Sequence, residues 1–168
     1  MALIVETGSN VVGAESYLSV SDADTYHANR GNAAWAALTT TETEQALRKA
    51  TDYMQTYRKR WKGYRSYATQ PLDWPRRTIL IDDSVLNSWI PYDSIPTEIK
   101  NACAELALRA AAGELAPDLE RAVASETVGP ISTTYVQGAP QYTQYRAIDM
   151  MLRPLLKNGG NGVSLVRA

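Results

Sequence analysis

The sequence predicts a mainly α-helical protein: a small helical bundle with a short N-terminal strand, a projecting β-hairpin or extended loop, and an extended C-terminal arm. Two long segments carry apolar residues at helical spacing, and a Thr-, Val- and Ile-rich segment lies between glycine and proline residues. The chain has 168 residues, of which 45% are hydrophobic and 21% charged, which suits one domain with one core. We expect a helical domain over residues 1–157 and a flexible arm over residues 158–168.

Short elements are predicted at the N-terminus. Residues 3–5 are expected to form a strand or an extended arm. Ser19 and Asp22 have the spacing of a capping box, in which a serine oxygen accepts a bond from a free backbone N–H. The helix that follows should end at Gly31. A second, brief helical turn is expected around Trp35 and Leu38.

The strongest signal predicts a helix over about residues 42–62. Thr41 and Glu44 have the spacing of a second capping box, and Gly63 supplies a stop signal. The apolar residues that recur at helical spacing are Ala46, Leu47, Ala50, Tyr53, Met54, Tyr57 and Trp61.

The next segment, residues 64–95, is predicted to be a loop-rich connection because four prolines interrupt it or follow it closely. Within it, residues 78–81 favour a strand fragment, and we expect Trp74 and Trp89 to anchor the connection by packing. A helix is then predicted from Glu98 to Ala112, with Cys103 on its apolar stripe.

The last part of the chain predicts elements that a single compact bundle does not need. Residues 123–136 favour exposed strands or a hairpin, within a projection over about 123–138, because Pro130 cannot donate to a central ladder. A last helix over roughly 143–153 should break at Pro154. Apolar residues in the projection and beyond the Gly-rich stretch 158–162 are expected to bind partners. These residues are Val128, Ile131, Tyr135, Val163, Leu165 and Val166.

The sequence predicts no catalytic residues, no metal site and no cofactor. His27 is the single histidine and Cys103 the single cysteine, so paired-histidine and cysteine-based zinc sites are excluded. We expect His27 to be a helix residue that is hydrogen-bonded locally and Cys103 to be a core residue. The chain has no phosphate-binding glycine motif, no signal-peptide pattern and no apolar run near the ~18 residues of a membrane span. We expect a non-enzymatic protein, made in the cytoplasm, with no membrane partner.

Charge is distributed in bands. Residues 48–77 carry nine bases and two acids, whereas the segments on either side are acidic. Within this band, the segment from Tyr57 to Tyr67 interleaves basic and aromatic residues, a pattern typical of single-stranded nucleic-acid binding. The basic side chains are expected to contact phosphates, and the aromatic rings are expected to stack on nucleobases. The candidates are Arg58, Arg60, Trp61, Lys62, Tyr64 and Arg65.

A second interpretation of the same segment needs no ligand. If Tyr57 and Trp61 lie on the buried stripe of the predicted helix, the neighbouring bases form its solvated face. The sequence favours this core interpretation of Trp61.

A set of short motifs is distributed over about residues 1–155. The motifs are Met1–Glu6, Ser16–Asp24, Ala50–Tyr53, Leu72–Arg76, Ile95–Lys100 leading into Ala104–Ala107, and Ser125–Ser132. In order and spacing they resemble tailed-bacteriophage head–tail connector (adaptor) proteins. Related chains are also labelled DnaT-like single-stranded DNA-binding proteins. The glycine-rich tail after Leu156 departs from the pattern.

The resemblance implies a structural virion protein at the head–tail interface, the neck of the particle. Copies of the chain would form a ring, usually twelve-fold, beneath the portal protein, and a closed ring requires two different surfaces on each copy. A tail or head-completion protein would attach to the ring, and double-stranded DNA would pass through its lumen without sequence-specific binding. The alternative function is a single-stranded DNA-binding accessory protein that uses the segment from Tyr57 to Tyr67.

Overall fold

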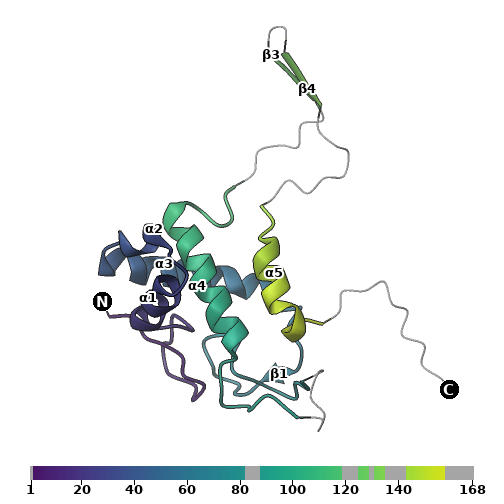
Figure 1. Cartoon of the computed structure of the whole chain (residues 1–168). Helices are drawn as coiled ribbons and strands as arrows, with labels where there is room; N and C mark the ends of the chain where they lie inside the picture. The colour runs from purple at the N-terminus through teal and green to yellow at the C-terminus, as the bar shows by residue number, and fades with distance from the viewer. Residues whose placement is uncertain (1, 82–87, 119–124, 129–130, 135–142, 158–168) are drawn as a thin grey trace, which may run out of the picture.

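The computed structural model describes residues 2–81, 88–118, 125–128, 131–134 and 143–157, and its fold is mainly helical, as predicted (Figure 1). The helices are α1 (Val20–Ala28), α2 (Ala33–Ala36), α3 (Thr40–Met54), η1 (Gln55–Tyr57), α4 (Thr97–Ala112), α5 (Arg146–Leu152) and η2 (Arg153–Leu155). The strands are β1 (Tyr64–Arg65), β2 (Arg76–Arg77), β3 (Ser125–Val128) and β4 (Ile131–Thr134). None of the described helices has the length and apolar composition of a membrane span.

The core lies between α3 and α4, with α1 and α5 packed against α4. Both central helices bury alanines along their facing sides, and these small side chains let the two backbones approach closely. Cys103 is fully buried here and lies 3.5 Å from the Thr51 hydroxyl, which confirms its predicted place in the core.

The helix starts follow the predicted capping chemistry. Ser19 caps α1 by accepting a bond from the Asp22 backbone N–H at 3.1 Å. The capping box of α3 is formed by Thr39 and Glu42, two residues before the predicted pair, and the Glu42 carboxylate accepts from the Thr39 N–H at 2.8 Å. The brief turn around Trp35 is α2, and Trp35 is buried.

The predicted helix over residues 42–62 is too long at its C-terminal end. α3 ends at Met54 and continues only as the single turn η1, although Tyr57 and Trp61 are both buried. The backbone of residues 60–62 instead pairs with residues 155–157: Trp61 bridges Leu156, and the Lys62 N–H donates to the Leu155 carbonyl at 2.9 Å. This long-range pairing replaces the helical bonds that the apolar spacing predicts.

Strand structure is short throughout the described residues. The predicted strand at residues 3–5 is a single bridge between Val5 and Ser16, and residues 78–81 contribute one bridge, between Leu80 and Trp89. The predicted hairpin is present, with β3 and β4 antiparallel and Val128 opposite Ile131. It lies apart from the helical body in Figure 1.

The C-terminal helix is shorter than predicted. α5 begins at Arg146, and Pro154 lies inside η2 instead of ending the helix. Tyr135, Val163, Leu165 and Val166 lie outside the described residues, as does the arm over residues 158–168. Their predicted role in partner binding, and that of Val128 and Ile131, remains a prediction.

Candidate functional site

The basic segment folds into a two-stranded ribbon at the foot of the body (Figure 1). β1 and β2 are antiparallel, with Tyr64 opposite Arg77 and Arg65 opposite Arg76. Because side chains directly opposite each other share one face of a ribbon, the first pair lies on one face and the second pair on the other. The two faces have different roles.

On the other face, Arg76 and Arg65 hold the backbone of the segment, Arg76 from a buried position and Arg65 from an exposed one. Arg76 is buried and donates to the carbonyls of Lys62 at 2.8 Å, Gly63 at 2.8 Å and Asp73 at 3.2 Å. Burial lowers the pKa of Arg76. Arg65 donates to the carbonyls of Gln70 and Leu72. These guanidinium groups satisfy carbonyls that no helix or long strand satisfies.

On the outer face, exposed aromatic residues lie near Arg77, which is exposed and donates to the Ser66 carbonyl. Tyr64 is 72% exposed, and Trp89 and Tyr92 are each 55% exposed. The Arg77 guanidinium lies 5.8 Å from the centre of the Tyr92 ring. Arg77, Trp89 and Tyr92 also line one open pocket of roughly 350 Å³. We call Tyr64, Arg77, Trp89 and Tyr92 the aromatic–basic surface.

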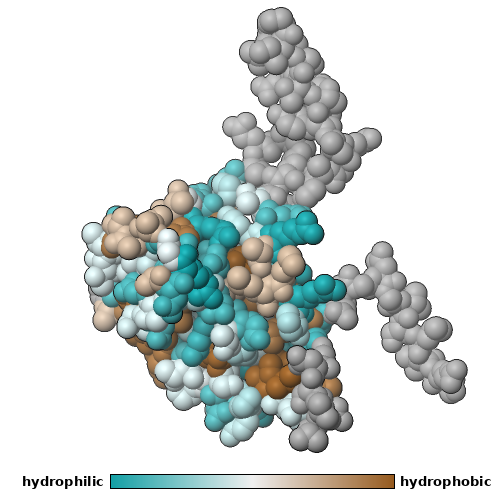
Figure 2. All heavy atoms as spheres, viewed as in Figure 1, coloured by the Kyte–Doolittle hydropathy of each residue, from teal (hydrophilic) through white to brown (hydrophobic). Residues whose placement is uncertain are grey.

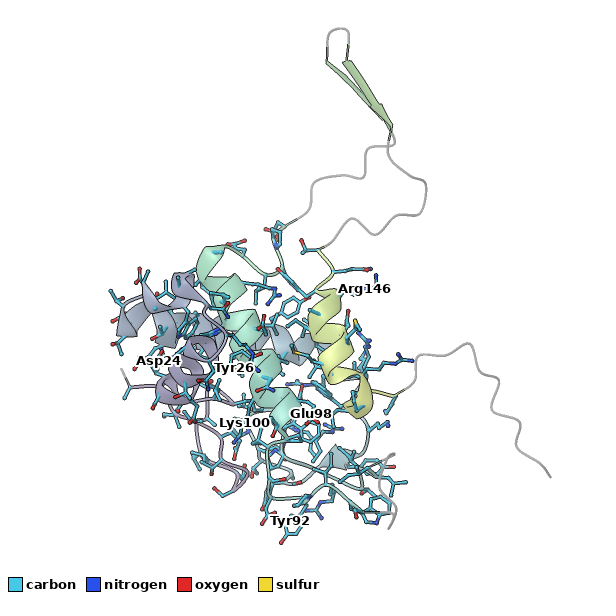
Figure 3. All side chains as sticks on the ribbon, in the orientation of Figure 1. Asp24, Tyr26, Tyr92, Glu98, Lys100 and Arg146 are labelled. Atoms are coloured by element: carbon cyan, nitrogen blue, oxygen red, sulfur yellow. The ribbon has the colours of Figure 1, made fainter. Side chains whose placement is uncertain are left out.

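Backbone contacts fix the position of this surface. The Ile90 N–H donates to the Ile79 carbonyl at 2.9 Å, which places Trp89 beside the ribbon. The Ser66 hydroxyl donates to the Tyr92 carbonyl at 2.6 Å. Figure 3 shows Tyr92 at the foot of the molecule, directed away from the body. Hydrogen bonds therefore hold the backbone that carries Trp89 and Tyr92, and both side chains are exposed to solvent.

Two residues with positive φ shape the same region. Gly63 has a φ of 62°, and an added Cβ would lie 2.2 Å from the Arg77 carbonyl oxygen. Thr78 has a φ of 64°, which is uncommon for a β-branched residue. Such backbone strain is often found at functional sites.

The structure places Trp61 in the core, as the sequence favoured. Its side chain is 1% exposed and packs edge-to-face on Trp74, with ring centres 5.8 Å apart. Trp61 therefore cannot stack on a nucleobase. Trp89, predicted to be a packing anchor like Trp74, is instead exposed, so that prediction is wrong for Trp89 and confirmed for Trp74.

The other predicted phosphate contacts divide into two kinds. Arg58 and Arg60 are half-exposed: Arg58 pairs with buried Asp73 at 2.8 Å, and Arg60 lies 3.6 Å from Asp149. Lys62 is partly buried and lines a separate apolar groove. Of the six predicted residues, Tyr64 is the one that belongs to the aromatic–basic surface.

Sequence reasoning missed Arg77, Trp89 and Tyr92. Arg77 ends the basic band, and the two aromatic residues flank Pro91 in a connection rich in proline. No local signal marks them, because Trp74, which precedes Pro75 in the same connection, is fully buried.

Charge at this end of the molecule is strongly positive. Residues 58–77 contain seven bases and one acid, giving a net charge of +6. The acid is Asp73, which is buried and paired with Arg58. The whole chain has a net charge of -1, so the positive field is concentrated in this segment.

His27 and Cys103, the remaining candidates for a chemical role, are both buried. His27 is buried, with one ring nitrogen 3.1 Å from the Ala104 carbonyl and the other 2.9 Å from the Asn32 amide. Burial raises the pKa of the Cys103 thiol. Within the described ranges, no group of three or more His, Cys, Asp or Glu side chains could hold a metal ion.

Comparison with known proteins gives one family. A family model described as "Putative DnaT-like ssDNA binding protein" matches residues 1–168. No curated protein and no solved structure matches the chain.

The match corrects the functional expectation drawn from the sequence. It supports the alternative, a single-stranded DNA-binding accessory protein, and contradicts the head–tail connector with its virion-specific roles. The motifs that carry the resemblance are non-catalytic stretches of a helical domain. Related chains carry either functional description, so these motifs alone do not distinguish a head–tail connector from a single-stranded DNA-binding protein.

Proposed function

Because the chain belongs to the DnaT-like ssDNA-binding protein family, we propose that it binds single-stranded DNA through the aromatic–basic surface. The observation that carries the proposal is the gathering of three exposed aromatic rings around Arg77, on the most basic segment of the chain. The binding needs no cofactor, and the protein acts as a binding module rather than an enzyme.

Single-stranded DNA suits this surface better than a duplex. Its bases are free to leave the stack, and any base can lie against Tyr64, Trp89 or Tyr92, with about 1–3 kcal/mol gained for each stacked base. A duplex keeps its bases paired and offers mainly phosphates. We therefore expect tighter binding to a single strand than to a duplex of the same length.

Arginine side chains would contact the phosphates. Arg77 lies among the rings, and Arg58 and Arg60 are half-exposed on the same basic segment. Each phosphate that is neutralised contributes about -0.7 to the slope of log affinity against log salt concentration. Two or three such contacts give a slope of about -1.4 to -2.1.

The test is fluorescence anisotropy of a labelled oligothymidine against salt concentration. We expect Trp89→Ala and Tyr92→Ala each to weaken binding about 5- to 150-fold, the equivalent of one lost stacking contact. Arg77→Gln should weaken binding and make the salt slope less negative by about 0.7.

Matched controls lie elsewhere on the body. Arg30 stacks on Tyr26 at 3.5 Å, so Arg30→Gln removes a similar arginine–tyrosine contact away from the aromatic–basic surface. Met150→Ala removes an exposed apolar side chain from α5. Both controls should bind like the wild type. If Trp89→Ala and Tyr92→Ala bind as tightly as these controls, the proposed surface is wrong.

A further inference from the structure

A groove without a role in the proposed function lies beside the ribbon. Its volume is roughly 750 Å³, within the range of ligand-binding pockets. Its apolar wall includes Leu80, Ile81, Ile90, Ile95 and Leu155. Figure 2 shows apolar residues at the surface in this lower part of the body. Apolar area left in water forgoes about 25 cal/mol per Å² of burial free energy.

The last described stretch of the chain ends at Lys157, at the edge of this groove. Leu155 lines the groove, Leu156 bridges Trp61, and the Lys157 N–H donates to the Arg60 carbonyl at 2.7 Å. The sequence after Lys157 contains three glycines and then Val163, Leu165 and Val166. The six residue-to-residue steps from Lys157 to Val163 span at most about 20 Å, enough to return to a groove that begins at Leu155.

We propose that the C-terminal segment Val163–Val166 of the same chain docks in this groove. Its three apolar side chains match the apolar wall, and the glycines permit the reversal of direction that docking needs.

The short connection favours the chain's own segment over a second copy. A short linker gives an effective concentration in the millimolar range, far above the concentration of other copies in a dilute solution. A weak apolar contact therefore forms within one molecule before it forms between two copies.

Docking has a consequence for the aromatic–basic surface, which rests on the proposed function. Ile90 and Pro91 line both the groove and the pocket beside Arg77. A docked segment would hold the backbone that carries Trp89 and Tyr92. The docking itself does not depend on DNA binding.

Disulfide trapping in the full chain tests the docking. Ile81→Cys combined with Leu165→Cys should form an intrachain disulfide, detected by mass spectrometry of the monomer. The control pair is Met150→Cys with Leu165→Cys, because Met150 is exposed on α5, close to the start of the tail, but does not line the groove. We expect the groove pair to form at least about tenfold faster than the control pair. The native Cys103 is fully buried in both.

Equal rates for the two pairs would overturn the proposal, and disulfide-linked dimers without intrachain product would assign the groove to a second copy. A second measurement avoids engineered cysteines in the body. In full-length protein with Val163→Asp, Leu165→Asp and Val166→Asp, amide exchange should speed up at Ile81 and Ile90, which donate to Ser88 and Ile79. Unchanged exchange would also contradict docking. Oligothymidine affinity, measured separately, reports on the proposed function and leaves this test independent of it.

Discussion

The helical body and the segment from Arg58 to Pro96 are stabilised by different interactions. In the body, apolar stripes of α3 and α4 face each other, and alanines such as Ala50 and Ala107 are fully buried. In the segment, side chains such as Arg65, Gln70 and Arg76 donate to backbone carbonyls. The difference shows that a basic residue of this segment can hold the backbone, as Arg76 does, or combine a backbone bond with exposure at the surface, as Arg77 does.

Trp61 joins the two regions and gives the largest expected effect. It precedes the ribbon, yet it packs against Trp74 and Tyr57 in the core. Trp61→Ala should lower the free energy of unfolding by about 3–5 kcal/mol, measured by urea denaturation followed by circular dichroism. The matched control is Trp89→Ala, which removes an exposed indole and should change stability by less than about 1 kcal/mol. Equal losses would remove the distinction between the two tryptophans.

A conservative variant refines this prediction. Within the described residues, the Trp61 Nε1–H is buried and has no hydrogen-bond partner. Trp61→Phe keeps an aromatic ring and removes this unsatisfied donor, so it should be clearly more stable than Trp61→Ala. A Phe variant as unstable as the Ala variant would mean that the indole makes a bond absent from this structure.

Arg76 and Arg77, adjacent in sequence, provide the next test of the comparison. Arg76→Met leaves the carbonyls of Lys62, Gly63 and Asp73 without their charged donor and should cost roughly 2–4 kcal/mol of stability. Arg77→Met, at the exposed outer face, leaves one carbonyl, that of Ser66, without its donor and should cost less, about 1 kcal/mol. The measurement is again the free energy of unfolding in urea. Similar losses for the two variants would mean that the two faces of the ribbon do not differ in role.

The sequence predicts the helical body well because burial there follows local periodicity. The start of α1 at Ser19 and the end of α4 at Gly113 depend on residues within one turn, so capping rules identify them. The buried state of Cys103 follows from its place on an apolar stripe. These features need no information from distant parts of the chain.

The segment from Arg58 to Pro96 is less predictable because distant contacts decide its structure. α3 ends at Met54 since residues 60–62 pair with residues 155–157, a contact that no local pattern indicates. The site is affected in the same way. Trp61 and Trp89 were both predicted to pack, and the tertiary structure buries Trp61 but exposes Trp89. The sequence shows the basic band, but it does not show which of the arginines in the band donate hydrogen bonds to backbone carbonyls.

Gly63 tests how closely the ribbon must approach the body. Gly63→Ala combines a left-handed backbone conformation with a Cβ 2.2 Å from the Arg77 carbonyl oxygen, and should cost roughly 2–3 kcal/mol. Gly31 has a φ of 66° and nothing within 4 Å of an added Cβ. Gly31→Ala therefore isolates the conformational part, about 1–2 kcal/mol. Thermal and urea unfolding of both variants gives the difference, and a Gly63→Ala variant no less stable than Gly31→Ala would contradict the close approach.

The smallest expected effect concerns pH and belongs to the body alone. Burial lowers the pKa of His27 below its ordinary value near 6.5, and the nearby Arg30 acts in the same direction, whereas the Ala104 carbonyl, Glu105 and Asp24 raise it. The neutral ring fits its surroundings, because one nitrogen can donate to the Ala104 carbonyl while the other accepts from the Asn32 amide. Protonation removes the acceptor.

The sign of the pH dependence follows from this direction. Since the folded pKa lies below the unfolded one, the unfolded chain binds the proton more readily, so His27 reduces stability as pH falls below about 6.5. The slope cannot exceed about 1.4 kcal/mol per pH unit. Urea unfolding from about pH 7.5 to about pH 5 should show a larger loss for the wild type than for His27→Gln, which cannot be protonated. Stopping near pH 5 keeps the Glu42 carboxylate ionised, because its bonds with Thr39 lower its pKa. Parallel curves for the two proteins would show that His27 is as easily protonated in the folded body as in the unfolded chain.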